Sequence, residues 1–132
     1  MKTPILFLVY NRPEHTGRVF EAIRKMRPEK LFVAADGPNS EKPGDKAACE
    51  TTRAVATATD WPCEVHTLFR EKNMGLRDSI PDAVNWFFNN VEEGIILEDD
   101  CLPSISFFHF CEHMLEKYRN DDRIAHINGS NF

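Results

Sequence analysis

The sequence predicts an α/β protein with a mostly parallel open sheet and helices on both faces of that sheet. Short apolar runs alternate with longer amphipathic segments along the chain, which is the pattern of repeated strand–helix–strand units. Several of these runs are apolar at nearly every position, as parallel strands are when both of their faces are buried. We expect right-handed crossover connections between the strands.

Five strands are expected, each marked by a short apolar or alternating run that is bounded by turn-forming residues. They cover residues 5–10, 31–35, 63–69, 95–97 and 124–128. In the third run, alternate positions from Cys63 to Phe69 lie on one face, which is the period of a strand. The fourth run follows Gly94 and ends directly at three acidic residues.

Four helices are expected between and after these strands. Asn11 is suited to cap the first helix, Pro13 fits its first turn, and Pro28 ends it. Asp45 is suited to cap the second helix, whose inward positions are Ala48, Thr52 and Val55. The helical spacing of apolar residues marks the last two helices, at Ile80, Val84, Phe87 and Val91 and at Phe107, Cys111, Met114 and Tyr118.

Length and composition fit one domain that covers residues 1–132. The formal net charge is −5 and the basic residues form no cluster, so we do not expect a nucleic-acid surface. No apolar run is long enough for a membrane-spanning helix, and the apolar first strand lacks the cleavage site of a signal peptide. The four cysteines show no zinc-binding spacing, and we expect reduced thiols in the cytoplasm.

The acidic residues Glu98, Asp99 and Asp100 follow the fourth strand directly. Adjacent carboxylates repel one another, and unpaired charge is costly to bury. A hard divalent cation held by carboxylate oxygens is the simplest group that would relieve this repulsion. The alternative is a solvated acidic turn that binds nothing.

Polar residues also follow the first two strands, at Asn11, Arg12 and Asp36. If the strand order is 3-2-1-4, these residues and the acidic triplet converge where the strand order reverses, which is where open α/β sheets bind ligands. A nucleoside diphosphate would use all of them. Its phosphates would bridge a metal on Asp100, assisted by Asp99 or Glu98.

The remaining contacts of such a ligand follow from charge and position. Arg12 or Arg77 would bind the phosphates, and Arg70 flanks a loop near the expected site. Asp36 would accept the N–H of a pyrimidine ring, which favours uracil over cytosine. The chain contains neither a P-loop motif nor a Gly-rich dinucleotide motif after the first strand, so neither of those nucleotide-binding modes is supported.

Three segments resemble the nucleotide-binding part of the GT-A-fold glycosyltransferases. They read FLVYNRP at residues 7–13, VAADGP at residues 33–38 and IILEDDCLPS at residues 95–104, followed by Phe107 and Phe108. The last segment is most similar to the Glu-Asp-Asp form of the family's D-x-D motif in N-acetylglucosaminyltransferases of the type I kind. A bacterial sugar-transferase-like group is also similar, and the resemblance covers nearly all of the chain.

The resemblance implies glycosyl transfer from a nucleotide-sugar, a UDP-sugar, to a hydroxyl acceptor such as a glycan, with Mn²⁺ or Mg²⁺ as cofactor. By position, Asp100 would bind the metal, and Glu98 and Asp99 would face the sugar and ribose. Asp36 would meet the uracil. The nucleotide pocket would be lined from the first strand by Tyr10, Asn11 and Arg12.

In this family the acceptor-binding half and its catalytic base follow the strand that here ends at Asn131 and Phe132. The resemblance therefore implies a truncated chain, and we expect it to bind nucleotide while catalysing little transfer alone; no residue is assigned as base. Two alternatives stay open. A sugar-phosphate nucleotidyltransferase shares the sheet but has a Gly-rich loop that this chain lacks, and a non-catalytic nucleotide-binding module would use the sheet as a scaffold.

Overall fold

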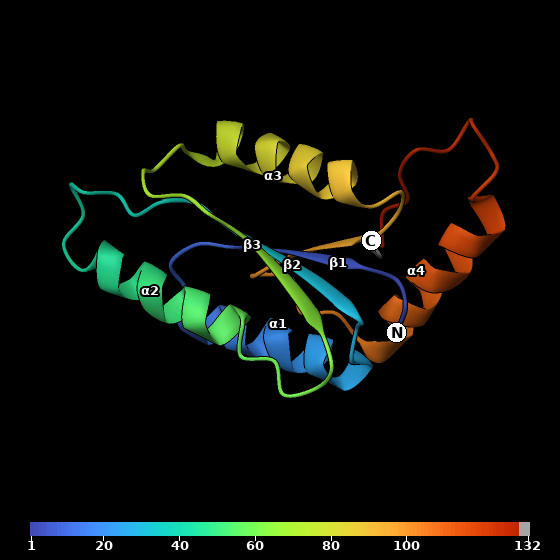
Figure 1. Cartoon of the computed structure of the whole chain (residues 1–132), viewed down its shortest axis with the longest axis horizontal. Helices are drawn as coiled ribbons and strands as arrows, with labels where there is room; N and C mark the ends of the chain where they lie inside the picture. Colours follow the sequence, from blue (N-terminus) through green and yellow to red (C-terminus); the bar gives the residue numbers. More distant parts are fainter. Residues whose placement is uncertain (130–132) are drawn as a thin grey trace.

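A computed structural model describes residues 1–129 of the chain. Strands and helices alternate along it, in the order β1 (Ile5–Val9), α1 (Pro13–Met26), β2 (Lys30–Ala35), α2 (Asp45–Ala56), β3 (Glu64–Phe69), α3 (Leu76–Asn90), β4 (Ile95–Glu98) and α4 (Ile105–Tyr118). The predicted α/β class with an open parallel sheet is confirmed (Figure 1).

The sheet has the order β3-β2-β1-β4, and every neighbouring pair is parallel. This is the order on which the predicted convergence of polar residues depends. Leu8 of β1 lies opposite Ala34 on one side and Glu98 on the other. The strands therefore end level with one another, and the loops that follow β1, β2 and β3 gather at the left of Figure 1.

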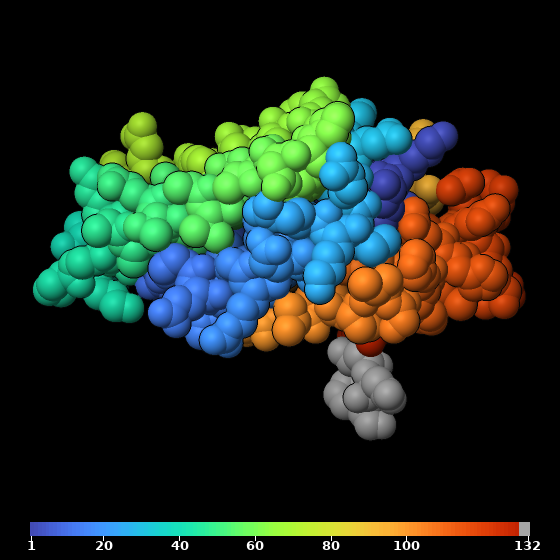
Figure 2. All heavy atoms as spheres, turned by 90° about the horizontal axis from the view of Figure 1, so that it is seen from below, coloured from blue at the N-terminus to red at the C-terminus, as the bar shows by residue number. Residues whose placement is uncertain are grey.

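Side chains of alternate strand positions build a hydrophobic core on each face of the sheet. On one face, β1 residues such as Ile5 and Phe7 pack with Ile23 of α1 and Phe108 of α4. Figure 2 shows this side of the molecule, where α2, α1 and α4 form the covering layer. On the other face, Leu6 and its neighbours pack against α3 alone.

The predicted fifth strand at residues 124–128 is wrong: this segment has no regular structure, and β4 is an edge strand of the described sheet. The apolar residues of this run suit a strand, but within residues 1–129 the segment does not join the sheet at the free edge of β4. Both isoleucines stay more than a third exposed. Asn131 and Phe132, at the end of this predicted segment, lie outside the described residues.

Two element boundaries near β1 differ from the expectation for one physical reason. Tyr10 was expected to end the strand and Asn11 to cap the helix, but β1 ends at Val9 and α1 begins at Pro13 without a side-chain cap. The side chains of Tyr10 and Asn11 instead donate hydrogen bonds to Asp45. The side chain of Asp45 is buried as a result.

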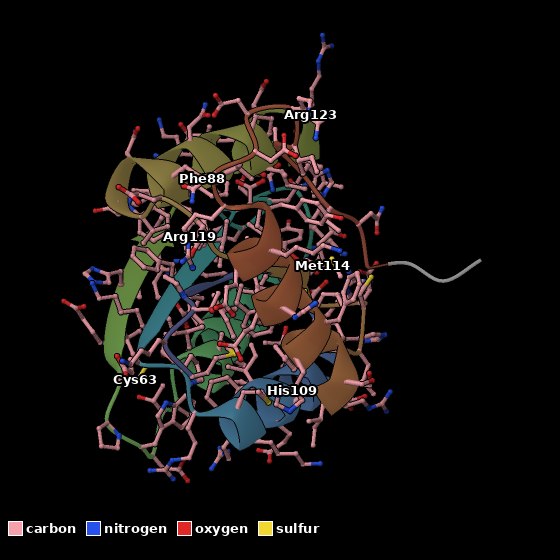
Figure 3. All side chains as sticks on the ribbon, turned by 90° about the vertical axis from the view of Figure 1, so that its right-hand side faces the viewer. Cys63, Phe88, His109, Met114, Arg119 and Arg123 are labelled. Atoms are coloured by element: carbon pink, nitrogen blue, oxygen red, sulfur yellow. The ribbon has the colours of Figure 1, made fainter. Side chains whose placement is uncertain are left out.

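The buried residues of α2 are Asp45, Cys49, Thr52 and Ala56. Of the predicted inward positions, Thr52 is buried, whereas Ala48 and Val55 are half-buried. Arg119, which follows α4, forms an ion pair with Glu93, which precedes β4 (Figure 3). Nη2 of Arg119 lies 2.7 Å from a carboxylate oxygen of Glu93. Among residues 1–129, no helix is both long enough and apolar enough to cross a membrane.

The packing of α3 on the sheet gives a first testable prediction. Phe87 of α3 is fully buried against the sheet, whereas the adjacent Phe88 is 43% exposed (labelled in Figure 3). Phe87→Ala is expected to lower the free energy of unfolding by about 3–5 kcal/mol because it leaves a cavity in the core. The matched variant Phe88→Ala should cost about 1 kcal/mol or less. Urea denaturation of both variants checks this, and similar losses in the two would contradict the described packing.

Candidate functional site

A cavity of about 600 Å³ opens at the carboxyl edge of the sheet. Residues from the ends of all four strands line it, so it lies where β1 separates β2 from β4. Most of the residues singled out from the sequence meet here, namely Tyr10, Asn11, Arg12, Asp36, Arg70, Glu98, Asp99 and Asp100. Arg77 does not line the cavity; it is exposed in the first turn of α3.

Arg12 and Asp99 form an ion pair across the cavity rim. Nη2 of Arg12 lies 2.6 Å from Oδ1 of Asp99, and Nε donates to Oδ2 at 3.3 Å. This hydrogen bonding raises the pKa of Arg12 above its ordinary value. Asp99 is 6% exposed, and the guanidinium supplies the counter-charge that a buried carboxylate needs. Asp99 was predicted to bind substrate and metal. Either ligand would therefore have to share the Asp99 carboxylate with Arg12.

A possible metal-binding group lies beside this ion pair and consists of Glu98, Asp100 and Cys101. One ligand atom from each lies within 4.8 Å of the others, and all three residues are exposed. The predicted ligand Asp100 belongs to the group, whereas the other predicted ligand, Asp99, does not. Nη2 of Arg12 lies 3.8 Å from Oδ2 of Asp100, and both side chains are nearly half exposed.

Cys101 is exposed at the edge of this group. Its Sγ lies 3.5 Å from Oδ1 of Asp100. Desolvation is the main cause that raises the pKa of the Cys101 thiol, and the hydrogen bond to Asp100 raises it further. A thiol beside two carboxylates gives the group oxygen ligands that suit Mg²⁺ or Mn²⁺ and one softer ligand.

Asp36 organises the loop between β3 and α3. Its carboxylate accepts backbone N–H bonds from Gly37, Met74 and Gly75 at 2.8–2.9 Å, and the residue is only 8% exposed. The loop passes so close that a Cβ on Gly37 would lie 2.3 Å from the carbonyl carbon of Lys72. Most of the hydrogen-bonding capacity that was predicted to meet a pyrimidine is therefore used by the protein backbone.

Asp45 was not identified as a site residue from the sequence, yet it connects three parts of the cavity wall. It is 2% exposed and accepts hydrogen bonds from the hydroxyl of Tyr10 at 2.6 Å, Nδ2 of Asn11 at 2.7 Å and the backbone N–H of Asn39 at 2.8 Å. Asn73 connects the β3–α3 loop to these hydrogen bonds, because its Nδ2 donates to the Tyr10 hydroxyl at 3.2 Å.

The Asp45 contacts change the ionisation of both phenol and carboxyl. The hydrogen bonds from Asn11 and Tyr10 lower the pKa of Asp45, so it is a carboxylate at neutral pH. Burial, together with the hydrogen bond to Asp45, raises the pKa of Tyr10 to about 12. Tyr10 therefore stays a neutral donor. An acid in the first turn of a helix is a common pattern, and only the fold reveals that this one is buried.

Arg70 also lines the cavity, but its charge is engaged. Its guanidinium pairs with Asp82 of α3, and its backbone N–H donates to the carbonyl of Ala35 at 3.0 Å. Arg12 is itself paired with Asp99, and it is the residue on the β4 side whose cationic group lies next to the exposed carboxylates. An anionic ligand at the cavity would thus meet Arg12 and a metal-binding group side by side.

Comparison with protein-family models finds no match to this chain, and comparison with curated proteins finds none either. The resemblance to GT-A-fold glycosyltransferases therefore stays a prediction that rests on the three sequence segments.

The lowered pKa of Asp45 predicts a pH-dependent contribution to stability. Its folded-state pKa lies below the ordinary value of 3.8, so the contribution is full above that value and is lost as the pH falls through the folded-state pKa. Near pH 7, Asp45→Asn should lower the free energy of unfolding by about 1.5–3 kcal/mol because hydrogen bonds to a charged group are weakened.

Urea denaturation of the wild type and Asp45→Asn between about pH 3 and pH 7 measures this difference, which should be constant above about pH 5 and shrink below about pH 4. The exposed Asp122→Asn variant serves as the control. A difference that is the same at pH 3 and pH 7 would show that the charge of Asp45 does not matter.

Proposed function

We propose that this chain is the donor-binding domain of a divalent-metal-dependent glycosyltransferase, which binds a nucleotide-sugar for transfer of the sugar to a hydroxyl acceptor such as a glycan. The observation that carries the proposal is the cavity at the carboxyl edge, where a metal-binding group, an arginine and polar strand-end residues line one space. This is the edge at which open parallel sheets bind nucleotides.

The charges of the cavity are arranged for a diphosphate held through a cation. Asp100 and Glu98 would hold Mn²⁺ or Mg²⁺, and Arg12 beside them would bind phosphate oxygens through charge-assisted hydrogen bonds. The metal, when bound, supplies Lewis-acid stabilisation of the negative charge on a departing diphosphate. Without a cation, the exposed carboxylates would repel the same ligand.

The nucleoside would lie on the other side of the cavity, against the ends of β1 and β2. Tyr10, Asn11 and Asp36 line this side, and their network of hydrogen bonds includes the buried carboxylate of Asp45. A uracil base suits the resemblance, so the proposed donor is a UDP-sugar. The four cysteines are free, which supports a reducing compartment such as the cytoplasm.

The proposal is tested by calorimetric titration with UDP in the presence and absence of Mn²⁺. We expect binding that needs the metal and that weakens at least about tenfold in Asp100→Ala, since the cation would lose a carboxylate ligand. The exposed acidic residue Asp122 provides the control, and Asp122→Ala should bind UDP as the wild type does.

Other results would point elsewhere. Preference for a nucleoside triphosphate over UDP would favour a sugar-phosphate nucleotidyltransferase. UDP binding that is equally tight without metal would remove the role given to Asp100 and Glu98. If no nucleotide binds in either condition, the proposed function is wrong.

A further inference from the structure

The side-chain amide of Asn11 is held in one orientation by Asp45. Its Nδ2 donates to Oδ1 of Asp45 at 2.7 Å. An ionised carboxylate can only accept hydrogen bonds, so it selects the NH₂ end of the amide. The other carboxylate oxygen, Oδ2, is engaged by the Tyr10 hydroxyl and by the backbone N–H of Asn39. Asp45 is thereby fixed from three directions and cannot turn away from Asn11.

The opposite end of the amide, Oδ1 of Asn11, is consequently an unused acceptor. Among residues 1–129, no donor forms a hydrogen bond to this oxygen. Asn11 lines the cavity and is half-buried, so Oδ1 is available to a ligand there. An oriented acceptor in a partly desolvated wall favours a ligand that brings an N–H and disfavours one that brings a lone pair.

Asp36, the residue first expected to read the base, is less suited to this task. Its two oxygens already accept three backbone N–H bonds, whereas the free oxygen of Asn11 accepts none within the described chain. Asn11 is also neutral, so it can contact a base without adding another negative charge to a cavity that contains Glu98 and Asp100.

We propose that Asn11 determines nucleobase specificity by accepting a ring N–H through Oδ1, and that Asp45 is the positioning residue that fixes the amide in this orientation. This inference rests on the proposed function and adds to it a means of choosing the base. Uracil carries an N–H at ring position 3, whereas cytosine carries an acceptor there, so the site distinguishes the two.

The test is the ratio of UDP to CDP affinity at saturating Mn²⁺, measured by calorimetry. The wild type should prefer UDP by about tenfold or more, which is the effect of one hydrogen bond that only the correct base can form. In Asp45→Asn the new NH₂ group needs an acceptor, so the Asn11 amide turns its oxygen toward it and presents its own NH₂ to the ligand. The ratio should then fall at least about tenfold.

Asn11→Ala removes the acceptor without altering the buried carboxylate, and it should lose the preference for UDP without presenting a donor to CDP. Adding Asp45→Asn to Asn11→Ala should change the ratio no further, because the two residues act as one unit. Glu50→Gln, on the exposed side of α2, is the matched control and should keep the wild-type ratio. Thermal unfolding shows that each variant is folded; if Asp45→Asn is not, Asn11→Ala alone decides.

The outcomes separate this inference from the proposed function. If the wild type binds UDP with metal but binds CDP equally well, or if Asn11→Ala keeps the preference, the inference is overturned and the proposed function stands. If Asp45→Asn folds and keeps the wild-type ratio, the positioning role of Asp45 is overturned. If neither nucleotide binds to the wild type, both the inference and the proposed function are overturned.

Discussion

The burial of three carboxylates at one edge of the sheet determines how the loops around the cavity are arranged. Asp36, Asp45 and Asp99 are each less than a tenth exposed, and a buried carboxylate is costly unless hydrogen bonds or an opposite charge compensate it. Each finds its partners in a different segment of the chain. Asp36 binds the β3–α3 loop, Asp45 binds the residues after β1, and Asp99 binds Arg12. The loops are thereby held in place before any ligand arrives.

These compensated carboxylates contrast with the exposed ones next to them. Glu98 and Asp100 lie beside Cys101 with little positive charge nearby apart from Arg12. The cavity wall thus has a rigid, hydrogen-bonded part around β1 and β2 and an acidic part at the end of β4. A ligand that pairs a neutral, hydrogen-bonding ring with a metal-bound anion fits both parts. This division is the physical basis for proposing a nucleotide-sugar.

The sequence was sufficient to predict most of the fold and the location of the site, because both follow from local patterns. Continuous apolar runs identify β1, β2 and β4, an alternating run identifies β3, and parallel strands deliver their terminal residues to one edge. What depends on pairing in three dimensions was not predictable in the same way. The apolar run at residues 124–128 was predicted as a strand, but the structure gives this segment no regular secondary structure. Asp45 has the pattern of an ordinary first-turn acid, and only tertiary packing buries it. Arg12 and Arg77 were both predicted to bind the phosphates, but Arg77 lies on α3 and does not line the cavity.

We propose that the acidic end of β4 holds a cation that joins a nucleoside diphosphate to this edge of the sheet. A crystal structure of the chain with UDP and Mn²⁺, with the manganese located by anomalous scattering, tests it most directly. We expect one manganese between the carboxylates of Glu98 and Asp100, in contact with the phosphates, and a uracil against the residues that follow β1. A manganese ion bound elsewhere, or a nucleotide bound on another surface, would contradict it.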